Sequence, residues 1–243
     1  MSYALDAGAG GGRRLGLILL STDETLEYEA RAMLAGRAVN LLHTRIPAHA
    51  HVTPETLRLM EDAMTAAAGL LPAGLNAVAY ACTSGATVIG SATVARLIQA
   101  AHPGVAVTDP LLAATAALRR LGVARIALVT PYLPSISIPM RAAFAQQGIE
   151  TVSEISFGQQ DDWTVARITE ESTLAAILEA GRAEGVEAVF ASCTNLRSLG
   201  ILERAEAALG LPVVSSNLAV IWHLLALGEV PAQGWAPGRL FRA

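Results

Sequence analysis

The sequence is poor in charged side chains, because Asp, Glu, Lys and Arg together make up only 16% of its 243 residues. The net charge of −4 shows no excess of basic residues, so we expect no nucleic-acid partner. No apolar run reaches the roughly 18 residues that a membrane-spanning helix needs, so we expect no membrane partner. Apolar residues make up 53% of the chain, which excludes intrinsic disorder and predicts a substantial folded core.

Cysteine is also scarce, since Cys82 and Cys193 are the only two in the chain. Each ends an apolar run of strand length, and each is followed by small polar residues. Arg13 and Arg14 precede a short apolar run that lacks the features of a secretory signal, so we expect free thiols and a cytoplasmic location. The two segments match at an offset of 111 residues, with identical pairs at Ala77 and Ala188, Val78 and Val189, Cys82 and Cys193, and Thr83 and Thr194. This repeat predicts that two half-chains face each other across one site.

Strand patterns alternate with helical patterns along the whole chain. This alternation is typical of α/β proteins with parallel sheets, whose ligands bind at the carboxyl ends of the strands. We expect two similar α/β domains, one of residues 1–115 plus 215–243 with a returning C-terminal helix, and one of residues 116–214. A single long doubly wound sheet is the alternative. The expected strands are 14–20, 39–44, 76–81, 105–108, 125–129, 151–156, 187–192 and 212–214.

The two cysteines are the candidates for chemistry. A helix is expected after each one, at 88–101 and at 196–209, and a helix N-terminus lowers the pKa of a nearby thiol. One thiolate could then act as base or nucleophile while the other thiol acts as acid. No flavin, nicotinamide or metal motif is present, so we expect no cofactor and no metal. The alternative for either cysteine is a buried, inert thiol that packs as a small apolar side chain.

Other polar clusters receive simpler interpretations. Asp161-Asp162 and Glu170-Glu171 are interpreted as solvated turns and helix starts. His43, His49 and His51 have no standard metal-site spacing and are expected in a loop over the mouth of the cleft.

Several segments together resemble a known family. They are Ser-Thr-Asp-Glu-Thr at 21–25, Tyr-Ala-Cys-Thr-Ser-Gly-Ala-Thr at 80–87, Thr-Pro-Tyr at 130–132, and Ser-Cys-Thr-Asn at 192–195. They are similar to the aspartate/glutamate racemase superfamily, and within it to the maleate cis–trans isomerase and arylmalonate decarboxylase branch. The ectoine-utilisation subgroup of that branch is the nearest match. The resemblance implies two Rossmann-like domains related by a pseudo-twofold axis, with the active site in the cleft between them.

The resemblance also implies roles for individual residues. Cys82 would be the nucleophile that adds to a double bond, and Cys193 would handle the proton transfers. In racemases of the superfamily the two thiols work on opposite faces of an α-carbon. The decarboxylases keep only the second cysteine. The residues at positions that bind substrate carboxylates would be Thr83, Ser84, Tyr132, Thr194 and Asn195.

The leading hypothesis is therefore a cofactor-independent isomerase or racemase of a small carboxylate, assembled as a homodimer or higher homo-oligomer. An arylmalonate-type decarboxylase, which is a lyase, and a non-catalytic metabolite-binding relative remain as alternatives.

Asp23 departs from the family pattern, because maleate isomerases carry asparagine in this loop. A carboxylate beside a dicarboxylate substrate would repel it by about 4 kcal/mol at a separation of about 4 Å and an effective dielectric of about 20. An amino group on the substrate would turn this repulsion into attraction, so Asp23 favours an amino-bearing substrate. The alternative is that Asp23 simply caps the helix that follows.

Overall fold

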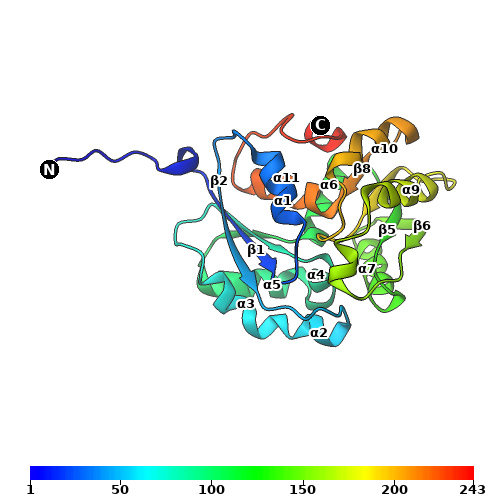
Figure 1. Ribbon diagram of the computed structural model, residues 1–243, viewed down its shortest axis with the longest axis horizontal. Helices are drawn as coiled ribbons and strands as arrows, with labels where there is room; N and C mark the ends of the chain where they lie inside the picture. The colour runs from blue at the N-terminus through cyan, green and yellow to red at the C-terminus, as the bar shows by residue number, and fades with distance from the viewer.

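The computed structural model describes residues 1–243 and contains two four-stranded sheets. The strand order is β2-β1-β3-β4 in the first sheet and β6-β5-β7-β8 in the second. All neighbouring strands are parallel. The second sheet thus repeats the order of the first, which confirms the α/β prediction with two similar units. The alternative of one long sheet is wrong. In Figure 1 the two sheets lie side by side, and the N-terminal residues extend away from the body.

The first half of the chain builds the first sheet and the helices that cover it. A capping box at Thr53 and a proline at the first helical position begin α2, as the sequence predicts. The elements are η1 (Ala9–Gly12), β1 (Arg14–Leu20), α1 (Leu26–Leu34), β2 (Asn40–Ile46), α2 (Pro54–Arg58), α3 (Met60–Ala68), β3 (Ala77–Ala81), α4 (Thr83–Ile89), α5 (Ser91–Ala101), β4 (Ala106–Thr108) and α6 (Pro110–Arg120).

The second half repeats this plan and adds one final helix. Side-chain caps from Asp161 and Thr169 begin its second and third helices. The elements are β5 (Arg125–Thr130), α7 (Pro134–Gln146), β6 (Glu150–Ser156), α8 (Asp162–Val165), α9 (Glu170–Ala180), β7 (Ala188–Ala191), η2 (Leu199–Ile201), α10 (Leu202–Leu209), β8 (Val213–Ser215), α11 (Ser216–Leu227) and η3 (Arg239–Phe241).

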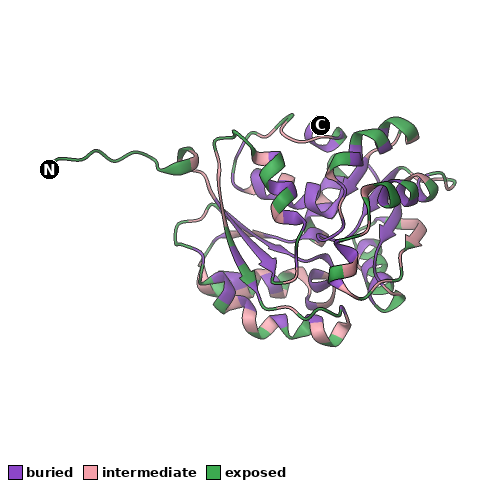
Figure 2. Cartoon of the chain, viewed as in Figure 1, coloured by how far each residue is buried: buried purple, intermediate pink, exposed green.

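The central strands of both sheets form the core. β3 and β7 are buried throughout, and β1 is buried after its first residue, as the purple strands in Figure 2 show. Such uninterrupted apolar runs occur where helices cover both faces of a parallel sheet. Gly16 in β1 allows this close packing, because a Cβ there would lie 2.9 to 3.1 Å from the side chains of Leu71, Leu75 and Val78. None of the helices combines the length and the apolar character that a bilayer crossing requires.

The last helix connects the two halves. α11 follows directly on β8 of the second sheet, yet it packs against β3, β4, α1 and α6 of the first half. We propose that the domain boundaries lie as the sequence suggested, with residues 215–243 joining residues 1–115 and residues 116–214 forming the other domain. The contacts of α11 support this division.

The helices after the two cysteines differ from the prediction. After Cys82 a helix starts at once, as α4, and Gly90 at φ 88° separates it from α5. After Cys193 no helix starts, and α10 begins only at Leu202. Between Cys193 and Leu202, backbone N–H groups donate hydrogen bonds to side chains of other elements. Local sequence pattern does not detect such long-range hydrogen bonds.

Candidate active site

Cys82 and Cys193 both line one closed cavity at the carboxyl ends of β3 and β7. The cavity has a volume of about 10 Å³, which is room for about one water molecule. Seven of the eight predicted site residues line it, and only Thr83 does not. The lining residues are Leu20, Asp23, Val52, Cys82, Ser84, Tyr132, Asp162, Cys193, Thr194 and Asn195.

Cys82 is the N-cap residue of α4. Its Sγ accepts a hydrogen bond of 3.2 Å from the backbone N–H of Gly85 and lies 3.4 Å from the Ser84 hydroxyl. The Tyr80 hydroxyl lies behind the thiol, because a Cβ on Gly85 would overlap that hydroxyl and come within 3.1 Å of Cys82 Sγ. Because Gly85 has no Cβ, the Tyr80 hydroxyl and the Cys82 thiol can both pack against its backbone.

Cys193 lies in an irregular turn at φ 120°, a backbone conformation that non-glycine residues rarely adopt. Its backbone N–H donates to the Ser216 hydroxyl at 3.1 Å, and that hydroxyl lies 2.8 Å from the hydroxyl of Thr83. The N–H of Asn195 lies 3.4 Å from Cys193 Sγ and donates to it. Thr83 thus supports the backbone of the opposite cysteine from outside the cavity.

A buried carboxylate holds the turn after Cys193. Glu29 on α1 accepts hydrogen bonds from the backbone N–H groups of Ser198 and Leu199 through Oε1, and from Asn217 Nδ2 through Oε2. Asn217 Nδ2 also donates to the carbonyl of Thr194 at 3.0 Å. Glu29, Ser216 and Asn217 are positioning residues that the sequence analysis missed, since each acts on a segment far from it in the chain.

Both thiols have raised pKa values, so the prediction of lowered ones is wrong for this closed cavity. Burial raises the pKa of Cys82 to about 11, although hydrogen bonds from Ser84 and Gly85 oppose the rise. Burial also raises the pKa of Cys193, with a further contribution from the charge of Asp162. The loss of solvation raises both pKa values more than the nearby N–H groups lower them. In addition, no helix begins after Cys193, although the prediction depended on one.

Asp23 does cap a helix, but with only one of its two oxygens. Oδ1 accepts hydrogen bonds from the backbone N–H groups of Thr25 and Leu26 at 3.0 and 2.9 Å. Oδ2 is buried and has no hydrogen-bond partner. Burial raises the pKa of this carboxyl to about 6, against the opposing effect of the two N–H groups and of the nearby Thr194 hydroxyl.

The interpretation of Asp162 as a solvated turn residue is wrong. Its exposure is only 6%, it lines the cavity, and its Oδ2 accepts a hydrogen bond from the Thr22 hydroxyl across the interface between the halves. Burial raises the pKa of this carboxyl as well. Asp162 lies in the segment after β6, just as the 47–52 loop lies after β2. Ligands of parallel sheets bind at the carboxyl ends of the strands, so the position of Asp162 after a strand could have identified it as a site residue.

The side chains of Asn195 and Thr194 join the two halves of the chain. Asn195 Oδ1 accepts from the N–H of Glu24, while its Nδ2 donates to the carbonyl of Asp162 at 3.0 Å. The Thr194 hydroxyl donates to the carbonyl of Ala81 at 3.3 Å. Both residues line the cavity, but both polar atoms of the Asn195 amide are already hydrogen-bonded to the backbone.

Two loops close the cavity from outside. The N–H of Val52 donates to the carbonyl of Gln160, and the N–H of Asp162 donates to the carbonyl of Ala50, which forms an antiparallel bridge between His51 and Asp161. The loop that contains His49 and His51 therefore covers the site, as predicted. The prediction is wrong for His43, which lies within β2.

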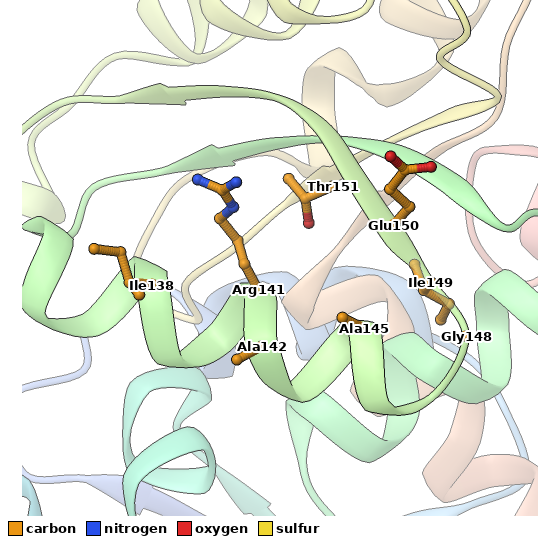
Figure 3. Close-up of a pocket in the computed structure, with 8 residues that line it drawn as sticks. All are labelled: Ile138, Arg141, Ala142, Ala145, Gly148, Ile149, Glu150 and Thr151. Atoms are coloured by element: carbon orange, nitrogen blue, oxygen red, sulfur yellow. The ribbon is translucent and has the colours of Figure 1, made fainter.

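A much larger open groove lies elsewhere in the protein. It has a volume of about 670 Å³ and lies between α7 and the edge strand β6, lined by Arg141, Glu150 and small or aliphatic residues (Figure 3). It contains no cysteine and no cluster of acids.

The chain is similar to known proteins along most of its length. The sequence pattern of the family described as arylmalonate decarboxylase matches residues 16–241. The maleate isomerase of Alcaligenes faecalis is 28% identical over 228 residues, which are 87% of this chain and 89% of the relative. The arylmalonate decarboxylase of Bordetella bronchiseptica is 29% identical over 197 residues, which are 78% and 81% of the two chains.

A solved structure gives a similar result. The maleate cis–trans isomerase of Nocardia farcinica, as a cysteine-to-serine variant with a covalently bound succinylcysteine intermediate, superimposes with a TM-score of 0.83 at 27% identity. The match covers 95% of this chain and 98% of that one.

Proposed function

Because the chain belongs to the arylmalonate decarboxylase family, we propose that it is a cofactor-independent isomerase of a small carboxylate, with Cys82 and Cys193 as its catalytic pair. The observation that carries this proposal is that both thiols line one cavity from matching strand ends. The similarity to maleate isomerases, one of which was solved with a succinylcysteine, supports covalent chemistry at a cysteine.

In the proposed cis–trans reaction, the Cys82 thiolate adds to one carbon of the double bond, and the Cys193 thiol gives its proton to the neighbouring carbon. The former double bond is then a single bond, about which the adduct rotates. The Cys193 thiolate takes the proton back, the carbon–sulfur bond breaks, and its electron pair returns to Cys82. No electrons are gained or lost overall.

The same pair could instead racemise an α-carbon. One thiolate would take the α-proton from one face, and the other thiol would deliver a proton to the opposite face. The two reactions need the same residues and differ only in the substrate.

Forming the thiolate is the demanding step, since burial favours the neutral thiol at both positions. The Ser84 hydroxyl and the Gly85 N–H lie against Cys82 Sγ and would stabilise its charge. These contacts support our proposal that Cys82 is the nucleophile.

We assign substrate contact to the groups that line the cavity. The hydroxyls of Ser84 and Tyr132 are donors suited to a carboxylate, and Asp23 Oδ2 is an acceptor. Thr194 also lines the cavity, but its hydroxyl donates to the carbonyl of Ala81. Thr83 and Asn195 are assigned a positioning role, because their side chains bond to Ser216 and to backbone groups.

A decarboxylase is the second candidate, favoured by the similarity to the Bordetella bronchiseptica enzyme. Release of carbon dioxide from a malonate would identify it. This chain has both cysteines, which favours the isomerase. The family resemblance implies that the decarboxylases have only the cysteine that corresponds to Cys193. A metabolite-binding relative would bind a ligand without turnover.

We further propose membership of the ectoine-utilisation subgroup, action in the cytoplasm and assembly as a homodimer or higher homo-oligomer. The two free cysteines support a reducing compartment.

The test is turnover of candidate carboxylates in heavy water by Cys82→Ser and Cys193→Ser. We expect each variant to lose at least about a thousandfold in kcat, since a hydroxyl is a far weaker acid and nucleophile than a thiol. Ser192→Ala is the matched control, because Ser192 adjoins Cys193 but bonds to Met140 outside the cavity. Full turnover by both cysteine variants would refute the proposal.

A further inference from the structure

We propose that the cavity selects a substrate with an ammonium group, and that the carboxyl groups of Asp23 and Asp162 make this selection. This inference rests on the proposed function, because the cavity is the one that holds the two thiols. It narrows the substrate to a small carboxylate that also carries a positive charge, such as an α-amino acid.

The first observation is an acceptor without a donor. Asp23 is 5% exposed and lines the cavity, and its Oδ2 is buried with no hydrogen-bond partner, while Oδ1 already accepts from Thr25 and Leu26. The Thr194 hydroxyl lies near enough to lower the pKa of this carboxyl, but it donates its proton to the carbonyl of Ala81. A buried carboxylate oxygen without a partner loses its solvation and gains nothing in return. An N–H donor on the ligand would satisfy it.

The second observation is another acid from the opposite half of the chain. Asp162 lines the same cavity at 6% exposure and accepts one hydrogen bond, from Thr22. The two carboxyl groups are close enough for the charge of Asp162 to act on Asp23. A single ammonium between them would relieve this repulsion and satisfy both groups.

The third observation is that the lining contains no positive charge. None of the ten lining residues is arginine or histidine, and the chain contains no lysine. Two arginines near the site are committed to backbone carbonyls: Arg45 to those of Leu20 and Asp23, and Arg197 to that of Ile168. A dicarboxylate such as maleate would meet two acids and no cation.

The thiols favour the same substrate class. A positive charge in the cavity would lower the pKa of Cys82 and favour the thiolate that the reaction needs. A second negative charge would raise that pKa further. The ammonium would therefore contribute to binding and to activation, and the substrate carboxylate would bind the hydroxyls of Ser84 and Tyr132.

The experiment compares two pairs of ligands that differ only by an ammonium group, L-aspartate with succinate and L-alanine with propionate. Binding is measured by calorimetry near pH 8 for the unaltered protein, Asp23→Asn and Asp162→Asn. We expect the ammonium ligand of each pair to bind the unaltered protein at least about tenfold more tightly. We expect each variant to lose most of that preference and to bind succinate more tightly than the unaltered protein does. Asp62→Asn, which removes an exposed carboxylate on α3, is the control and should leave the preference unchanged.

A second measurement needs no substitution. The preference of the unaltered protein should shrink when the pH falls from about 8 to about 5, because the Asp23 carboxyl gains its proton near pH 6. Asp162, Cys82, Cys193 and Tyr132 are the other titratable lining groups; burial keeps the thiols and the phenol neutral over this range.

Equal binding within each pair, or a preference that survives both substitutions, would overturn the inference. The readout is an affinity and not a catalytic rate, so its outcome is separate from that of the proposed function. If the cysteine variants kept full activity while the ammonium preference held, the catalytic proposal alone would fail.

Discussion

The Ser216 hydroxyl accepts a hydrogen bond of 3.1 Å from the backbone N–H of Cys193. It also lies 2.8 Å from the hydroxyl of Thr83, the residue that follows Cys82. The first residue of α11 therefore links the segments that carry the two thiols. Cys193 has a positive φ, so this bond helps to hold a backbone conformation that its own sequence does not favour.

Ser216→Ala should reduce kcat at least about tenfold with little change in KM. The substitution leaves the buried N–H of Cys193 without an acceptor, which costs about 1 to 3 kcal/mol and loosens the thiol. Steady-state kinetics and urea unfolding would measure both effects. Ser215→Ala is the matched control: it removes the cap of α11, costs about 1 kcal/mol, and should leave kcat nearly unchanged. Equal kinetic losses in both variants would contradict a specific role for Ser216.

Glu29→Gln should destabilise the fold by about 2 to 3 kcal/mol, because three N–H groups point at the carboxylate and a glutamine amide turns a donor toward one of them. Chemical denaturation would show this loss. Glu27→Gln on the same helix removes partly exposed ion pairs with Arg31 and Arg45, and should cost less than about 1 kcal/mol. Similar losses for the two variants would mean that the buried network contributes nothing.

Asp23 should make the fold less stable as the pH rises. Its pKa rises from 3.8 to about 6 on folding, because burial disfavours the charged form, so the folded protein binds this proton more tightly than the unfolded chain does. The free energy of unfolding should therefore fall by about 2 kcal/mol between about pH 4 and pH 7 on account of this group. Asp23→Asn keeps the cap and removes the titration, so the difference between the two pH profiles isolates it. Parallel profiles would contradict the shift.

Gly85→Ala should destabilise the protein by about 1 to 3 kcal/mol, although alanine is the better helix former. The new Cβ would overlap the Tyr80 hydroxyl. Adding Tyr80→Phe removes that oxygen, so the double variant should recover a large part of the loss. A double-mutant cycle on thermal unfolding would measure the coupling. Additive effects would show that the hydroxyl and the glycine do not meet.

Local pattern predicted most of the architecture. The strand that ends at Cys82 and the strand that ends at Cys193 are apolar runs bounded by polar residues, and periodicity detects such runs directly. The repeat around the cysteines correctly predicted two similar units with both thiols facing one cavity. It did not predict the turn after Cys193, because that turn is held by Glu29 and Ser216 and not by its own residues.

By itself the sequence determined the order of strands and helices, the repeat of the two halves and the pair of cysteines, since each depends on neighbours along the chain. Only the tertiary structure decided that the thiols are neutral, that Asp162 enters the cavity beside Asp23, and that one oxygen of Asp23 is left without a partner. Burial and long-range contacts arise only when distant segments pack together. They determine the pKa values of these groups and their hydrogen-bond partners.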